Sequence, residues 1–154
     1  MNKTAMTAEE LRNTLIGAWN LVSYVECPTD GSADRHPLGE DPMGIIMYTP
    51  DGFMSAQLMN PERKPVASGD WFNVTESEAM EKSMSYIAYS GPFEVSDEAL
   101  THGMTVSMFP NWIGQTQPRV VETDGKNLHL STAVPIMSGG VEVNSYLTWE
   151  RAAA

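Results

Sequence analysis

Residues 43–59 read MGIIMYTPDGFMSAQLM, and this stretch decides the class of fold. Two strand-like runs flank Pro50-Asp51-Gly52, where proline and glycine supply the backbone angles of a tight turn. The pattern predicts a β-hairpin. We therefore expect an antiparallel sheet around it.

Further strands are predicted on both sides of the hairpin. Alternation over residues 19–25 predicts a first strand with Trp19, Leu21, Ser23 and Val25 on one face and Asn20, Val22, Tyr24 and Glu26 on the other. After Gly91-Pro92 the period of two returns. It predicts strands at residues 93–96, 100–109, 119–123, 128–133 and 141–151.

About eight strands result, and sequential antiparallel strands with short turns favour an up-and-down barrel, because closure removes exposed edges. We predict one all-β domain over residues 1–154. The interior of an eight-stranded barrel is filled by side chains or holds one small ligand. A two-sheet sandwich is the competing architecture.

Two helices are predicted beside the strands. A short one covers residues 7–15, where Thr7 and Glu10 have the spacing of a capping box. A second is inserted between strands at residues 75–89, where Thr75 and Glu78 repeat that spacing. The second helix would place Met80, Met84 and Ile87 on one face.

Charge and composition exclude several partners. The net charge of -11 would repel a nucleic acid backbone. No apolar run approaches the roughly 20 residues that cross a bilayer, and the first residues, MNKTAMTAEELRNTLIG, lack the apolar core of a secretory signal. We expect a cytoplasmic protein that binds neither nucleic acid nor membrane.

The sequence offers no sign of a metal or a cofactor. The three histidines, His36, His102 and His129, lack the spacing of a metal site, and Cys27 is the lone cysteine. His129 lies between Leu128 and Leu130, so we expect it to face solvent. Glycine motifs that bind nucleotides are absent from the sequence.

Several segments resemble one known family. Gly17-Ala18-Trp19 and the closing Trp149-Glu150-Arg151 resemble the G-x-W and final arginine of lipocalins, in which the arginine packs across the tryptophan. The segments LIGAWNLVSY, GIIMYTPDGFMSAQLM, YSGPFEV and the pattern from His102 to Arg119 resemble bacterial and fungal lipocalin-like domain proteins. The resemblance covers residues 15–151 and implies a small barrel of the calycin type, used by both carriers and cofactor-free enzymes.

His102 and Arg119 are the first candidates for chemistry. Alternation places His102 on one face with Leu100, Met104, Val106 and Met108, so we expect an imidazole in an apolar interior. Arg119 shares a face with Val121, and a buried guanidinium needs an anion from the protein or from a ligand. A core histidine and a structural salt bridge are the competing interpretations.

A second set of residues is predicted to contact a ligand. The loop from Phe109 to Gly114 lies between two strands, where a barrel opening is expected, and aromatic rings there would either contact a ligand or plug the end. Methionine is frequent, and its flexible side chain suits an adaptable cavity or ordinary core filling. The candidates are Tyr48, Gln57, Tyr89, Met104, Asn111, Trp112 and Tyr146.

Three functions remain open from the sequence. The first is a carrier of a small, largely apolar or aromatic molecule. The second is a cofactor-independent lyase, isomerase or cyclase, in which His102 acts as acid or base and Arg119 or Tyr48 stabilises negative charge. The third is a barrel filled by its own side chains that acts through protein contacts, and a homodimer is considered for all three.

Overall fold

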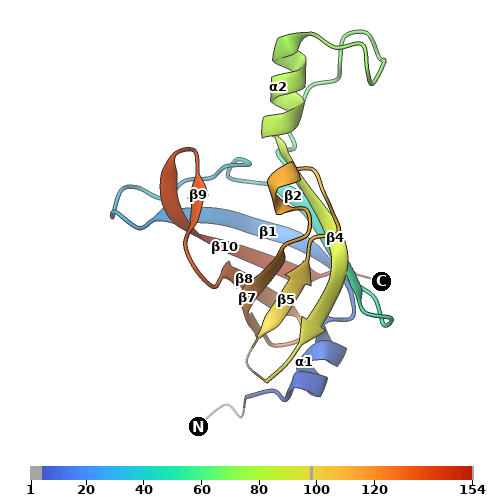
Figure 1. Ribbon diagram of the computed structural model, residues 1–154, viewed down its shortest axis with the longest axis vertical. Coiled ribbons are helices and arrows are strands. Elements are labelled where there is room, and N and C mark those ends of the chain that lie inside the picture. The colour runs from blue at the N-terminus through green and yellow to red at the C-terminus, as the bar shows by residue number, and fades with distance from the viewer. Residues whose placement is uncertain (1–4, 98, 154) are drawn as a thin grey trace.

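The structure, a computed structural model, describes residues 5–97 and 99–153 (Figure 1). Within those residues eight strands form a closed antiparallel barrel, and the last pairs with the first. The sandwich alternative is thereby excluded. The strands are β1 (Gly17–Pro28), β2 (Met43–Tyr48), β3 (Phe53–Met59), β4 (Tyr86–Val95), β5 (Leu100–Gly103), β7 (Thr116–Thr123), β8 (Asn127–Thr132) and β10 (Val141–Arg151).

Two short strands extend the barrel outside its closed ring. The strand β6 (Val106–Ser107) pairs with β4, and β9 (Ile136–Ser138) pairs with β10. The predicted hairpin is confirmed as β2 and β3, which pair from Met43 opposite Met59 to Tyr48 opposite Met54. Gly52 has a φ of 96°, which only glycine adopts at low cost.

The first and last strands are held together by Trp19 and Arg151. The Arg151 guanidinium carbon lies 3.8 Å from the centre of the Trp19 ring, as the resemblance implied. Its Nη1 donates a hydrogen bond of 2.8 Å to the carbonyl of Ile16, and Nη2 donates to the carbonyl of Thr14. The Trp19 ring nitrogen donates to the carbonyl of Leu15, at 2.9 Å. These contacts seal one end of the barrel under helix α1 (Ala8–Leu15).

A β-bulge in β1 interrupts the alternation predicted for that strand. Leu21 pairs with Trp149, but Ser23 pairs with Thr148, so one extra residue interrupts the register. The predicted face holds for Trp19 and Leu21 and is wrong beyond them. Tyr24 and Glu26 are buried instead of Ser23 and Val25, because an extra residue exchanges the two faces.

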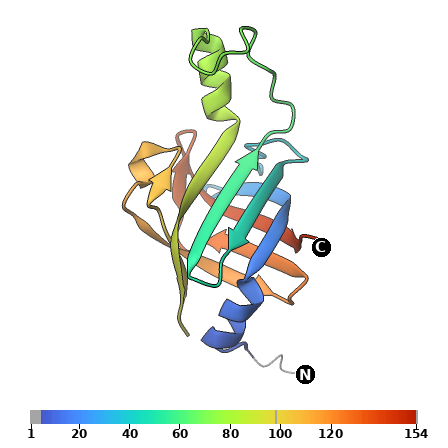
Figure 2. The same ribbon diagram turned by 90° about the vertical axis from the view of Figure 1, so that its right-hand side faces the viewer.

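The second helix is shorter than predicted. Helix α2 spans Glu76–Met84 and has the predicted capping box at Thr75, whereas the chain from Tyr86 onward pairs with β3 instead of continuing the helix. Tertiary pairing overrides helix propensity there. The helix has no buried residue and projects from the barrel with the loop before it (Figures 1 and 2). Among the described residues, neither helix is long and apolar enough to span a membrane.

The predicted strand over residues 100–109 is interrupted after Gly103. Gly91 and Gly103 approach so closely that a Cβ on Gly91 would lie 2.0 Å from the Gly103 carbonyl oxygen. The chain then turns, with Met104 exchanging backbone hydrogen bonds with Gly114 and Gln115. Leu100, His102 and Met104 are buried as predicted, but Val106 and Met108 are exposed, so the shared face was wrong for these two.

We expect Arg151→Ala to lower the free energy of unfolding by about 2–4 kcal/mol, because it removes one cation–π contact and hydrogen bonds to three carbonyls, those of Thr14, Ile16 and Gly125. Arg151→Lys should recover only part of this loss, since an ammonium lacks the planar fork. Urea unfolding measures both variants. Lys126→Ala, which changes an exposed cation, is the control, and an equal loss there would contradict the argument.

Candidate ligand-binding site

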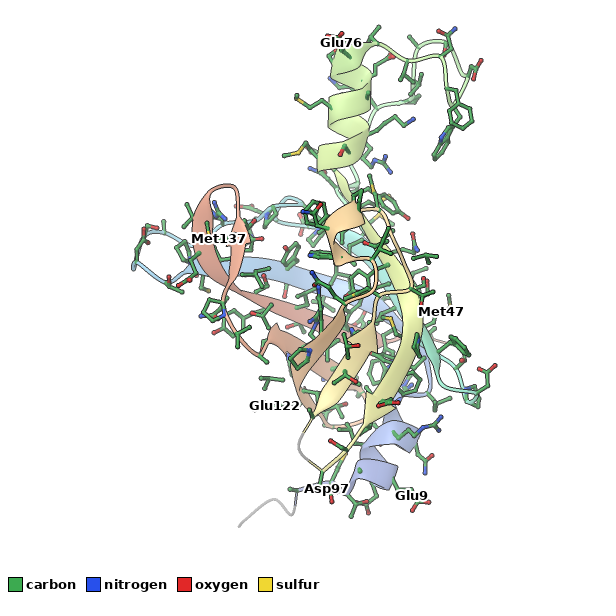
Figure 3. All side chains as sticks on the ribbon, viewed as in Figure 1. Glu9, Met47, Glu76, Asp97, Glu122 and Met137 are labelled. Carbon is green, nitrogen blue, oxygen red and sulfur yellow. The ribbon has the colours of Figure 1, made fainter. Side chains whose placement is uncertain are left out.

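The residues that line a large pocket come from segments at the end of the barrel opposite α1. Figure 1 shows two of these segments, β9 and the start of β4, at that end. The volume of the pocket is about 630 Å³, within the range of roughly 300–1,000 Å³ typical of small-molecule sites. Met137 of β9 lines one side of this pocket, and the C-terminal end of helix α2 lines another (Figure 3). The walls come from β1, the 35–38 loop, the end of α2, the start of β4, the 108–112 segment and the β9 turn. We call it the mouth pocket.

A second, much smaller cavity lies inside the barrel. Its volume is about 80 Å³, less than the roughly 150 Å³ of a protein cavity known to bind benzene. It shares Tyr24, Ile87, Trp112 and Ile136 with the mouth pocket, so the two spaces adjoin. The mouth pocket has the volume typical of a small-molecule site, and the interior cavity is well below it.

Arg119 and Gln117 place the strongest donors on the interior cavity. Both residues line it from β7, and Arg119 Nη2 donates to Gln117 Oε1 at 2.8 Å. Arg119 Nη1 donates to the Pro118 carbonyl at 3.1 Å. Among the described residues the ion pair within 4.0 Å joins Arg35 to Glu26, and no carboxylate of those residues lies within that distance of the Arg119 guanidinium.

A second polar group lies where the two spaces meet. The Tyr24 hydroxyl donates to Glu26 Oε1 at 2.9 Å, and Arg35 Nη2 lies 2.8 Å from Glu26 Oε2. Burial, followed by the Glu26 charge, raises the pKa of Tyr24 well above its usual value. The buried carboxylate is thus compensated on both oxygens, and Tyr24 presents a neutral phenol to the ligand spaces.

His102 and Tyr48 form a buried pair behind the cavity. The Tyr48 hydroxyl and His102 Nε2 share a hydrogen bond of 2.8 Å, and neither residue lines the two spaces. Burial, with the Arg119 charge as a smaller cause, lowers the pKa of His102 to about 3. Burial also raises the pKa of Tyr48. Both side chains are neutral at pH 7, and Tyr89 lies between His102 and Trp112.

The remaining predicted residues divide into two groups. Tyr89 lines the interior cavity, and Trp112 lines both spaces. Met104 is buried in the core, and Gln57 accepts a hydrogen bond of 2.7 Å from the Tyr86 hydroxyl. Asn111 and Tyr146 are exposed. None of these last four lines either space, so the structure does not bring them together with Arg119.

Sequence reasoning missed Tyr24, Glu26, Arg35 and Gln117. The bulge that turns Tyr24 and Glu26 inward leaves no sign in the residue pattern. Gln117 could have been found, since it stands two residues before Arg119 on the same face of one strand. Among the described residues, no group of three His, Cys, Asp or Glu side chains could hold a metal ion.

Comparisons with known proteins agree with this geometry. A family model described as a lipocalin-like domain matches residues 16–152. The 4'-hydroxy-3'-methoxypropiophenone carrier protein ppsC of Aspergillus oryzae (strain ATCC 42149 / RIB 40) is 40% identical over 106 residues. That match covers 64% of this chain and 96% of the relative. The comparisons thus support a role in carrying a small ligand.

We expect stability to depend on pH through His102. Its pKa is lowered from the ordinary 6.5 to about 3, so the unfolded chain binds more protons between these values. The free energy of unfolding therefore rises with pH across this window, by at most about 1.4 kcal/mol per pH unit, and the full contribution is present above 6.5.

Urea unfolding at a series of pH values tests this dependence. His102→Gln should flatten the slope relative to the wild type, since it removes the titrating group. His129→Gln changes an exposed histidine and should leave the slope unchanged. An equal slope in the wild type and His102→Gln would show that other groups cause it.

Proposed function

Because this chain belongs to the lipocalin-like domain family, we propose that it is a carrier of a small, largely apolar or aromatic molecule. The observation that carries the proposal is the mouth pocket of about 630 Å³ beside a nearly filled barrel. The aromatic body of the ligand lies in the mouth pocket and one small substituent enters the interior cavity. The ligand would therefore lie mainly at the mouth of the barrel and would not be wholly enclosed by the strands.

Aromatic side chains supply the contact area for such a ligand. The Trp112 ring packs edge-on against Phe109, with centroids 5.4 Å apart, and against Tyr89, at 5.8 Å. Phe109 and Trp112 line the mouth pocket, and Tyr89 lines the cavity behind it. The fixed edge-to-face geometry presents a rigid aromatic wall, which binds planar rings at little cost in conformational entropy.

The name of the relative suggests the ligand class. A 4'-hydroxy-3'-methoxypropiophenone is a phenolic aryl ketone, with one ring and short polar substituents. We propose the same class for this chain, because its mouth pocket accommodates a single substituted ring.

We favour a carrier over an enzyme in which His102 acts as acid or base. A general base must reach the proton that it removes, and His102 lies behind Tyr89 without lining either space. Its Nε2 is occupied by Tyr48, and its low pKa makes it a weak base. We therefore assign His102 and Tyr48 to the core that supports the cavity wall.

We expect the wild type to bind 4'-hydroxy-3'-methoxypropiophenone in calorimetry and to release it unchanged, as checked by chromatography. Trp112→Ala should weaken binding by about 10- to 100-fold, because an aromatic contact of roughly 1.5–3 kcal/mol is lost. Trp71→Ala is the matched control, since Trp71 is exposed and stacks on Lys82.

Because Trp112 also packs against the core, Trp112→Ala could lose binding through misfolding, and a second variant controls for this. Phe109→Ala changes a half-exposed ring of the same wall and should weaken binding while the circular dichroism spectrum stays native. Failure of the wild type to bind, or chemical conversion of the ligand, would refute the carrier proposal. Equal losses in Trp112→Ala and Trp71→Ala would refute the proposed position.

A further inference from the structure

Arg119 stands out among the cavity residues because its charge has no counterion among the described residues. An arginine keeps its proton at all physiological pH values, and its five N–H groups only donate. Its hydrogen bonds go to two neutral acceptors, Gln117 Oε1 and the Pro118 carbonyl. A half-buried cation held in this way lacks the anion that usually compensates it.

We propose that Arg119 forms an anion subsite at the inner end of the ligand site, and that this subsite selects ligands ending in a phenolate or carboxylate oxygen. The inference rests on the carrier function proposed above. The interior cavity, about 80 Å³ in volume, accommodates such an oxygen but not the ring that bears it. The ring then stays in the mouth pocket beside Trp112, which lines both spaces.

Gln117 is the positioning residue of this subsite. Its Oε1 accepts from Arg119, while its Nε2 donates to Gln115 Oε1 at 2.9 Å. Both ends of the amide are therefore engaged. The guanidinium is held on the cavity before any ligand arrives, and preorganised donors cost less entropy on binding.

The charge of Arg119 acts on the neighbouring side chains inside the barrel. It contributes to the low pKa of His102 and opposes the raised pKa of Tyr48. The acidic side chain that lines the ligand spaces, Glu26, is compensated by Arg35 and by the Tyr24 hydroxyl. An anionic oxygen in the cavity thus meets one uncompensated cation and no uncompensated anion among the described residues.

Phenolic aryl ketones suit this subsite. An acyl group para to the hydroxyl spreads the phenolate charge onto the ketone oxygen, so these phenols are more acidic than tyrosine. A nearby cation favours the charged form further. The subsite should therefore bind the phenolate and lower the pKa of the bound phenol.

The test uses two matched probes, 4-hydroxyacetophenone and 4-methoxyacetophenone, which differ by the ionisable hydroxyl. Calorimetry should show the hydroxy probe binding more tightly as pH rises toward the pKa of the free phenol, with the methoxy probe unchanged. Absorbance should show the bound hydroxy probe as phenolate at a pH where the free probe is neutral.

The methoxy probe also serves as a control for protein groups that titrate and thereby change the affinity of the pocket. The titratable groups that line the subsite beside Arg119 are Tyr24 of β1 and Tyr89 of β4. Tyr48 of β2 and His102 of β5 lie behind the cavity, and Glu26, paired with Arg35, lines the adjoining mouth pocket. Any effect of these groups on the pocket acts on both probes. The difference between the probes therefore isolates the ligand hydroxyl.

Three variants assign the effect to Arg119. Arg119→Gln should weaken binding of the phenolate by about 10- to 100-fold, the value of a charged hydrogen bond of roughly 1.5–3 kcal/mol, and should leave the methoxy probe within twofold. Arg119→Lys keeps the charge and should retain part of the preference. Lys126→Gln removes one exposed cation and should change neither probe.

The outcomes separate this inference from the carrier function. If both probes bind equally at every pH, or if Arg119→Gln keeps the preference for phenolate, the anion subsite is refuted and the carrier function stands. If the wild type binds neither probe, both proposals are refuted. An equal loss in Lys126→Gln would attribute the preference to overall charge and would also refute the subsite.

Discussion

Closure of the sheet between β1 and β10 is the constraint on which the rest of the structure depends. Arg151 lies over the Trp19 ring and donates to carbonyl groups at the end of α1 and in the turn after it, so one set of contacts joins both ends of the sheet to the helix. This end of the barrel is filled. Access to the interior is consequently left to the opposite end, where the 108–112 segment, β9 and the start of β4 surround the mouth pocket.

Aromatic rings extend from the mouth into the interior of the barrel. Ring contacts run from Phe109 through Trp112 and Tyr89 to His102 and on to Tyr48. Together with the aliphatic core, the buried members of this series leave an interior cavity much smaller than the pocket at the mouth. In our proposal the mouth pocket supplies the apolar contact area for a ligand, and Arg119 supplies a charge in the interior cavity.

The sequence predicted those parts of the fold that depend on local chemistry. The Pro50-Asp51-Gly52 turn and the Thr7 and Thr75 capping boxes follow from residues whose role is set by their own backbone or by a short motif. The contact between Trp19 and Arg151 was implied by the resemblance to lipocalins. The number of strands and their short turns predicted the closed barrel, and the resemblance supported it. Within the candidate site, Arg119 could be selected by residue type and alternation, Trp112 by its place in a loop and Tyr89 by residue type alone.

What the sequence could not predict depends on contacts between distant segments. The strand that starts at Tyr86 reads as a helix until β3 is beside it. The break after Gly103 arises from its close approach to Gly91, and the inward position of Tyr24 arises from a bulge against β10. His102 was predicted correctly as buried, but only the positions of Tyr48 and Tyr89 reveal that it is shielded from the ligand spaces.

The bulge in β1 also separates the length of that strand from the chemistry of the site. Deleting Val22 would restore a regular ladder with β10, because Leu21 would stay opposite Trp149 and Ser23 opposite Thr148. Alternation from Leu21 would then still place Tyr24 and Glu26 on the inner wall, and Arg35 would keep its carboxylate partner. At this point of the barrel, a one-residue insertion or deletion can therefore change the regularity of a strand without changing the side chains that line the mouth.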